Sequence, residues 1–228
     1  MFVKACNRVR ESIYGLNGLS QVTPTQVNAT NATGFMIAPG VLATAGHFCH
    51  VESDPTKPLH GVFEAIRSPD VGQTMESATL VAVDSVRDLA LLRLANPRSR
   101  ACVSLAQQRV ATGTPCGSLG FPLASVIFSQ TGRQFNLLER FQSASISAYA
   151  TLPHATGRQL TYYETDSLMY GGSSGCPGFL DDGQVFGMHV GSATDQAGAK
   201  KDGARLAIAI WVPAADIRAL ALANGVSL

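Results

Sequence analysis

Residues 170–179 read YGGSSGCPGF, and this stretch decides how the rest of the chain is interpreted. Three side chains that could act as nucleophiles, Ser173, Ser174 and Cys176, stand within four positions of one another. The surrounding glycines favour a tight turn, because glycine adopts backbone conformations that other residues avoid. The same composition is also typical of a flexible loop. Which residue does chemistry therefore depends on what other segments supply.

Composition excludes several classes of protein. The chain has 228 residues, of which 46% are hydrophobic and 14% charged, with a formal net charge of +1. These values predict a folded, weakly charged protein and favour neither a nucleic-acid partner nor a membrane partner. No apolar run is long enough for a membrane span, and the first residues lack the apolar core of a secretory signal. The five cysteines and five histidines show no metal-ligand spacing, so we expect no metal and no cofactor. We expect a cytoplasmic protein with reduced thiols, or a secreted one if a signal peptide has been removed.

Short β-branched and apolar runs alternate with Gly, Pro, Asn and Ser along the chain, which predicts an all-β barrel or sandwich. Such runs stand at 12–16, 34–37, 41–45, 78–83, 89–94, 125–130, 144–150, 160–166, 184–190 and 205–212. A helical pattern is convincing only at the end, where Pro213 can begin a helix and Asn224 can help to end it. We expect loops at 28–33, 51–75 and 131–142.

Two further segments carry residues that suit a serine nucleophile. Residues 41–50, VLATAGHFCH, form an apolar strand that runs into His47, and residues 87–94, RDLALLRL, form one that begins after Asp88. His50 and Asp84 are the alternatives for the base and the acid, but neither stands in the same local pattern.

The three motifs in the order His, Asp, Ser resemble those of the chymotrypsin-fold serine peptidases, and are most similar to the HtrA-type and glutamyl endopeptidase branch. The matching residues are Thr44-Ala45-Gly46-His47, Asp88-Leu89-Ala90-Leu91, and Thr165-Asp166 followed by Gly172-Ser173-Ser174-Gly175-Cys176-Pro177. The resemblance implies two packed six-stranded antiparallel β-barrels with the active site between them. It divides the chain into a first barrel at 1–100, a second at 101–212 and a short C-terminal helix at 213–228.

The resemblance also implies a serine endopeptidase acting on protein or peptide substrates. Ser174 would attack the peptide carbonyl, His47 would take its proton, and Asp88 would orient the imidazole. The backbone N–H groups of Gly172 and Ser174 would form the oxyanion hole. Ser173 stands where trypsin-like zymogens carry their activation aspartate, so we expect that switch to be absent. Two alternatives stay open: a Cys176 or Cys49 nucleophile, and a non-catalytic binding module on the same fold. A regulatory protein partner beside the substrate also stays open.

Substrate preference depends on the segment 187–192, GMHVGS. The resemblance makes this strand one wall of the S1 pocket, with His189, Val190, Gly191 and Ser192 lining it. An imidazole donor there favours Glu or Gln at P1. The opposite wall has Leu168 and Met169, where glutamyl endopeptidases have a hydroxyl residue. A medium apolar P1 residue is therefore the alternative.

Overall fold

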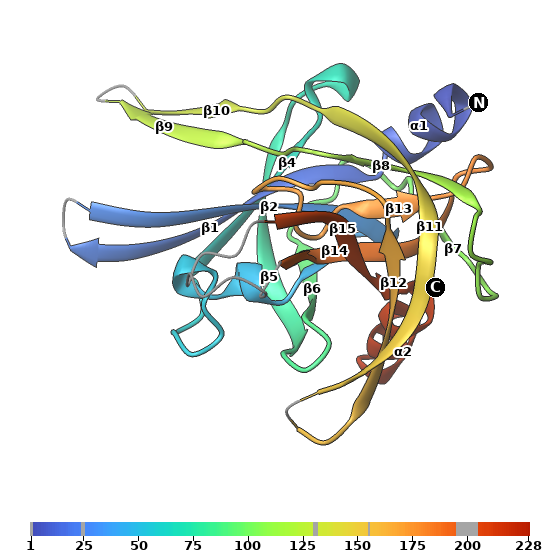
Figure 1. Cartoon of the computed structure of the whole chain (residues 1–228). Helices are drawn as coiled ribbons and strands as arrows, with labels where there is room; N and C mark the ends of the chain where they lie inside the picture. The colour runs from blue at the N-terminus through green and yellow to red at the C-terminus, as the bar shows by residue number, and fades with distance from the viewer. Residues whose placement is uncertain (1, 24–25, 130–131, 155, 195–204) are drawn as a thin grey trace.

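The computed structural model describes residues 2–23, 26–129, 132–154, 156–194 and 205–228, and it confirms an all-β fold (Figure 1). The first half contains helix α1 (Val3–Arg10) and strands β1 (Ile13–Thr23), β2 (Gln26–Ala38), β3 (Val41–Ala45), β4 (Val62–Arg67), β5 (Met75–Asp84) and β6 (Leu89–Leu94). It also has the 3₁₀ turns η1 (His47–Cys49), η2 (Val51–Ser53) and η3 (Pro69–Val71). The second half contains β7 (Ser104–Leu105), β8 (Pro115–Gly120), β9 (Ser125–Ser129), β10 (Gly132–Asn136), β11 (Arg140–Pro153), β12 (Gln159–Thr165), β13 (Pro177–Phe179), β14 (Gln184–Thr194), β15 (Arg205–Pro213) and helix α2 (Ala214–Ala223).

The first barrel is a closed ring of antiparallel strands in the order β1-β2-β3-β6-β5-β4. Strand β4 closes the ring by pairing with β1, so the expectation of a loop throughout 51–75 is wrong. The buried Glu64 in the middle of β4 interrupts the apolar pattern that would have indicated a strand. The loop expected at 28–33 is also wrong, because these residues lie in β2 and pair with β1. Their polarity suits a hairpin that extends beyond the barrel and exposes part of both strands.

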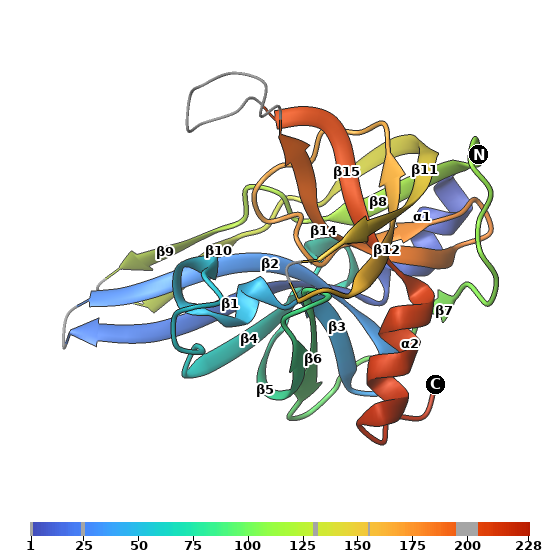
Figure 2. The same cartoon turned by 60° about the horizontal axis from the view of Figure 1, so that its bottom comes forward.

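The second half forms a ring of six strands, as expected. Its sheet runs β13-β8-β11-β12-β15-β14, and the pairing of β13 with β14 closes it. The short strand β7 adds to this ring as a seventh strand, parallel to β14. The segment 131–142 is not simply a loop, because 132–136 form β10, which pairs with β9. The β1–β2 and β9–β10 hairpins project to the same side of the molecule (Figures 1 and 2).

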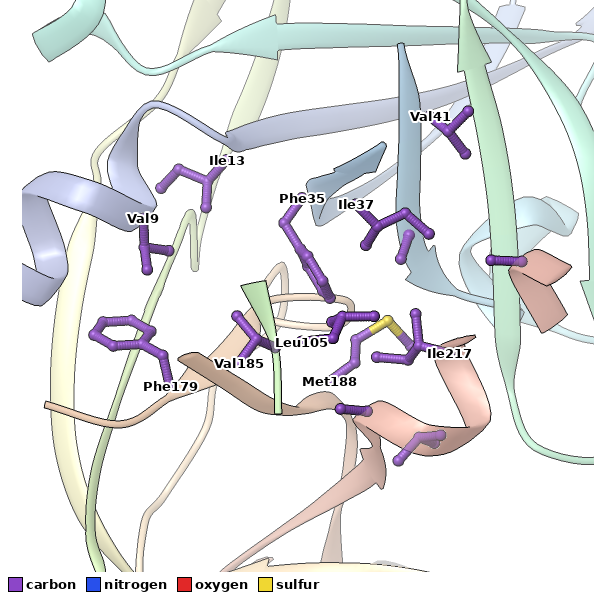
Figure 3. Packing of buried hydrophobic residues seen from close by; sticks show 14 of the residues in the cluster. Val9, Ile13, Phe35, Ile37, Val41, Leu105, Phe179, Val185, Met188 and Ile217 are labelled. Carbon is purple, nitrogen blue, oxygen red and sulfur yellow. The ribbon is translucent and has the colours of Figure 1, made fainter. Parts of the chain in front are cut away.

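The core explains why several strands are apolar without interruption. In β2, Met36 points into a cluster inside the first barrel, whereas Phe35 and Ile37 point into a second cluster between the barrels. Strand β6 divides in the same way, because successive side chains of a strand point to opposite faces. Figure 3 shows the second cluster, in which Phe35 meets residues of the other half such as Met188. A third cluster fills the second barrel around Trp211.

Two helices flank the barrels. Helix α2 begins directly after Pro213, as the sequence predicts, and buries Ile217 against the cluster between the barrels. Helix α1 was not predicted, although Ala5, Cys6 and Val9 have helical spacing and are buried. Neither helix in the described part of the chain is long and apolar enough to cross a membrane.

Candidate active site

The first part of the site is a two-point contact between His47 and Asp88. Strands β3 and β6 pair so that Ala45 lies opposite Leu89, which places the ends of both strands side by side. One carboxylate oxygen of Asp88 accepts a hydrogen bond from the His47 backbone N–H at 2.6 Å. The other lies 2.6 Å from the His47 Nδ1 atom. Because both oxygens are engaged, the carboxylate fixes the imidazole in position as well as in tautomer.

The backbone around this pair is constrained. Asp88 has a positive φ of 57°, which is uncommon for a residue with a side chain. The Gly46 N–H donates to the Asp88 carbonyl at 2.9 Å, and a Cβ atom at Gly46 would lie 3.1 Å from the Asp88 backbone. Glycine at position 46 therefore allows the close approach of the two segments.

The second part of the site is the turn at residues 170–176, which we call the oxyanion turn. Ser173 N–H donates to the Tyr170 carbonyl, and Cys176 N–H donates to the Ser173 carbonyl. Gly172 and Gly175 have φ values of +89° and +81°, a region that favours glycine. A Cβ atom at Gly172 would lie 2.7 Å from the Phe121 carbonyl oxygen. The two glycines are thus required by conformation and by space.

Contacts of Gly175 bring the turn against the strand that ends at His47. A Cβ atom at Gly175 would lie 2.1 Å from the Thr33 carbonyl oxygen and 2.9 Å from the Ala45 N atom. Ala45 is two residues before His47. The segments that carry His47, Asp88 and Ser174 therefore come together at the junction of the two barrels.

The alternative acid and base lie in other contacts. Asp84 binds the Arg87 guanidinium at 2.9 Å and accepts hydrogen bonds from the backbone N–H groups of Val86 and Arg87. Burial raises the pKa of Asp84, but these hydrogen bonds outweigh it and lower the pKa overall. His50 has its Nδ1 atom 2.8 Å from the Lys57 carbonyl. Neither residue makes a contact like that of His47 with Asp88.

The two cysteines near the site are poor candidates for a nucleophile. Cys49 is fully buried, and burial, followed by the nearby charge of Asp88, raises the pKa of its thiol to about 12. Cys176 is equally buried, and burial raises the pKa of its thiol as well. A thiol acts as a nucleophile in its ionised form, which burial disfavours at both positions.

The residues predicted to bind substrate lie in different surroundings. His189 is only 4% exposed, and its ring packs edge-on against Trp211 with 5.2 Å between the ring centroids. Met169 is 3% exposed and belongs to the core of the second barrel. The Leu168 carbonyl accepts a hydrogen bond from the Gln142 side chain, while Val190, Gly191 and Ser192 are half-buried.

A cavity of about 200 Å³ is lined in part by the oxyanion turn. Its walls include Met169 and the buried Ser173, but neither His189 nor Leu168. It therefore does not join the two predicted walls of the S1 pocket into one pocket.

Sequence reasoning missed the threonine that links the parts of the site. Thr33 is fully buried, and its N–H donates to the Ser174 carbonyl at 2.8 Å. The only signal in the sequence is that Thr33 directly precedes the apolar run of 34–37, on the same face as Phe35 and Ile37. That signal could not be interpreted without knowing which face meets the second barrel.

Two antiparallel barrels with this arrangement at their junction define the class of chymotrypsin-fold serine peptidases. The chain matches the family model of the trypsin-like peptidase domain over residues 32–188, which is more than half of its length. The chain therefore belongs to the trypsin-like peptidase family and is a serine endopeptidase by class.

Solved structures show the same fold. The Rv3671c protease of M. tuberculosis in its active form superposes with a TM-score of 0.71 and 19% identity, over 98% of this chain and 85% of that one. Its inactive form gives a TM-score of 0.70 and 18% identity, over 97% and 93%. The serine endoprotease of Yersinia pestis gives 0.70 and 16% identity, over 98% of this chain and 66% of that one. At these identities the likeness concerns the fold. No curated sequence matches the chain.

Proposed function

We infer that this peptidase cleaves peptide bonds through an acyl-enzyme on Ser174, with His47 as the base and Asp88 as the residue that orients it. The observation that carries this proposal is the two-point contact of Asp88 with His47 beside the oxyanion turn. With Nδ1–H bound to the carboxylate, the His47 Nε2 atom keeps a free lone pair that can accept the Ser174 hydroxyl proton.

The reaction then follows from these roles. The Ser174 Oγ atom attacks the peptide carbonyl carbon while its proton passes to His47 Nε2. The oxygen of the tetrahedral intermediate becomes an anion, which the N–H groups of Gly172 and Ser174 stabilise. His47 returns the proton to the leaving amine, and a water molecule activated by the same imidazole hydrolyses the ester.

Labelling with a fluorophosphonate probe tests the nucleophile. The probe phosphonylates an activated serine, so we expect labelling of the wild-type protein and of Cys176→Ala. Ser174→Ala should not be labelled, while circular dichroism shows that it is folded. Labelling that survives in Ser174→Ala, or that disappears only in Cys176→Ala, would contradict the proposal. A folded wild-type protein without labelling would favour the binding module.

For specificity, we propose Glu or Gln at P1, read by His189. The proposal is supported by the position of His189 in β14. The backbone carbonyl of His189 accepts a hydrogen bond from the Gly175 N–H at 2.7 Å, which keeps this strand beside the oxyanion turn. The buried thioether of Met169 favours the alternative, a medium apolar residue.

Fluorogenic peptides that vary only at P1 distinguish the two preferences. The role of His189 is supported if the wild-type protein cleaves after Glu or Gln and His189→Leu cleaves these peptides more slowly. Cleavage of peptides with Leu or Val at P1 should be the same in both proteins. Preference for Leu or Val in the wild-type protein would rule it out. Folding of His189→Leu is checked by its thermal transition, because the ring packs on Trp211.

A further inference from the structure

The Thr33 side chain joins the first barrel to the oxyanion turn. It lies on the face of β2 that meets the second barrel, two and four residues before Phe35 and Ile37 of the cluster between the barrels. The residue is 0% exposed, so its hydroxyl has to be satisfied by the protein itself.

Both hydrogen-bonding capacities of this hydroxyl are used. The Phe121 N–H lies 3.0 Å from the Thr33 Oγ1 atom, and Oγ1 lies 2.9 Å from the Gly172 carbonyl oxygen. Because a backbone N–H can only donate, the Thr33 oxygen accepts from Phe121 and its proton is directed to Gly172. The direction of the hydroxyl is therefore fixed by its neighbours.

The backbone of Thr33 is held as firmly as its side chain. Its N–H donates to the Ser174 carbonyl at 2.8 Å, and its carbonyl accepts the Thr44 hydroxyl at 2.8 Å. Thr44 is three residues before His47. One residue thus contacts the turn that carries Ser174 and the strand that leads to His47.

The contact with Gly172 bears on the two donors of the oxyanion hole. The Gly172 carbonyl belongs to the peptide plane that lies between the planes carrying the Gly172 and Ser174 N–H groups. A change in the dihedral angle on either side of this middle plane, ψ of Gly172 or φ of Ser173, turns one donor plane relative to the other and so changes the angle between the two N–H directions, because each peptide unit is rigid. The neighbouring carbonyls are also held, since Gly171 accepts the Leu123 N–H at 2.8 Å and Ser173 accepts the Cys176 N–H at 2.9 Å.

We propose that Thr33 is a positioning residue for this peptidase: its hydroxyl holds the Gly172–Ser173 peptide so that both oxyanion donors converge on one point. The hydroxyl also affects the peptide that precedes Gly172. It accepts a hydrogen bond from the Phe121 N–H, and two residues further on the Leu123 N–H donates to the Gly171 carbonyl. The role rests on the proposed function of Gly172 and Ser174. It does not require Thr33 to touch the substrate.

Thr33→Val tests the proposal, because it keeps the shape of the side chain and removes the hydroxyl. We expect kcat on the best fluorogenic peptide to fall about 10- to 100-fold with KM changed less than about twofold, since misplaced oxyanion donors act on the transition state. The rate of fluorophosphonate labelling should fall by a similar factor. Thr33→Ser keeps the hydroxyl and should stay within about threefold of the wild type.

Thr30→Val is the matched control on the same strand. Its hydroxyl contacts His60 and the Phe48 carbonyl and has no contact with the oxyanion turn. We expect Thr30→Val to have the kinetics of the wild type. That result would show that a slow Thr33→Val variant reflects the contact with the oxyanion turn and not the loss of any hydroxyl from this strand. If Thr33→Val does not fold, Thr33→Ala removes the same hydroxyl without filling its space.

Two results would overturn the proposal: folded Thr33→Val with the wild-type labelling rate, or Thr33→Ser as slow as Thr33→Val. Amide hydrogen exchange keeps the test independent of catalysis. Residues 170–176 should exchange faster in Thr33→Val than in Thr33→Ser, Thr30→Val and the wild type. If the wild type is not labelled at all, the proposed function fails, and exchange alone decides whether Thr33 holds the turn.

Discussion

Replacement of Gly175 by alanine probes the junction of the two barrels at its tightest point. The residue has a φ of +81°, and a Cβ atom there would lie 2.1 Å from the Thr33 carbonyl oxygen and 2.4 Å from the Thr44 hydroxyl oxygen. Neither contact can be relieved by rotating the new side chain, because a methyl group on the Cα has no rotamers. The first barrel or the oxyanion turn has to move.

The expected magnitude has two parts. A left-handed conformation costs an alanine about 1–2 kcal/mol. Moving the turn away from Thr33 also breaks the bond from Thr33 N–H to the Ser174 carbonyl and strains the bond from Gly175 N–H to the His189 carbonyl. Each buried partner left unsatisfied costs about 1–3 kcal/mol. The free energy of unfolding should therefore fall by about 3–8 kcal/mol, and the Tm by about 6 °C or more.

Gly113→Ala is the matched control. Gly113 has a φ of +86°, and nothing lies within 4 Å of its ideal Cβ position. Gly113→Ala should be destabilised only by the cost of the left-handed conformation, with a fall in Tm of about 2–8 °C. Thermal denaturation followed by circular dichroism measures both variants, and fluorophosphonate labelling measures the site. A Gly175→Ala protein as stable and as reactive as Gly113→Ala would refute the close contact of the two barrels at this turn.

Two further predictions concern ionisable groups. Asp88→Asn should lower kcat at neutral pH by about 10⁴-fold, because the amide N–H₂ facing His47 Nδ1 selects the tautomer whose Nε2 atom is protonated; an unchanged labelling rate would contradict the role of Asp88. His60 is buried with its ring nitrogens near the hydroxyls of Ser20 and Thr30, and burial lowers the pKa of its imidazole below the ordinary value of 6.5. The unfolded chain then binds the proton first, so stability is lost as the pH falls below about 6.5 toward the folded-state pKa. Urea unfolding midpoints at about pH 7.5 and about pH 5 should differ less in His60→Gln than in the wild type; equal differences would contradict the assignment.

The sequence predicts the fold and the three motif segments because their information is local. An apolar strand that runs into His47, another that follows Asp88, and a turn with glycines around Ser174 can each be identified from a few neighbouring residues. Strands β11, β12, β14 and β15 and helix α2 also agree with expectation, since their apolar runs and the proline before the helix are local signals. Closure of the second ring is expected only from the family resemblance, because β8 and β13 coincide with none of the predicted apolar runs.

The sequence fails where a residue's role depends on distant parts of the chain. Strand β4 contains a buried Glu64, which reads as a loop residue until the barrel closes around it. Thr33 lies in the polar segment 28–33, which only the pairing with β1 identifies as a strand. Met169 and His189 are both buried, and their sequence neighbours do not show which of them a substrate side chain would meet.

The junction of the barrels uses apolar and polar contacts for different purposes. Residues such as Phe35 and Met188 bury surface between the two halves, which holds them together but sets no direction, because the hydrophobic effect is not directional. Catalysis by the proposed mechanism needs N–H groups aimed at one point, and only hydrogen bonds with fixed donors and acceptors supply such an aim. The Thr33 hydroxyl supplies it from inside the apolar face of β2, where an unsatisfied hydroxyl would be costly. Because the buried hydroxyl has no water to bind instead, an arrangement of the oxyanion turn that breaks the bond to Gly172 leaves it unsatisfied and is disfavoured. Burial of Thr33 therefore favours one arrangement of the turn.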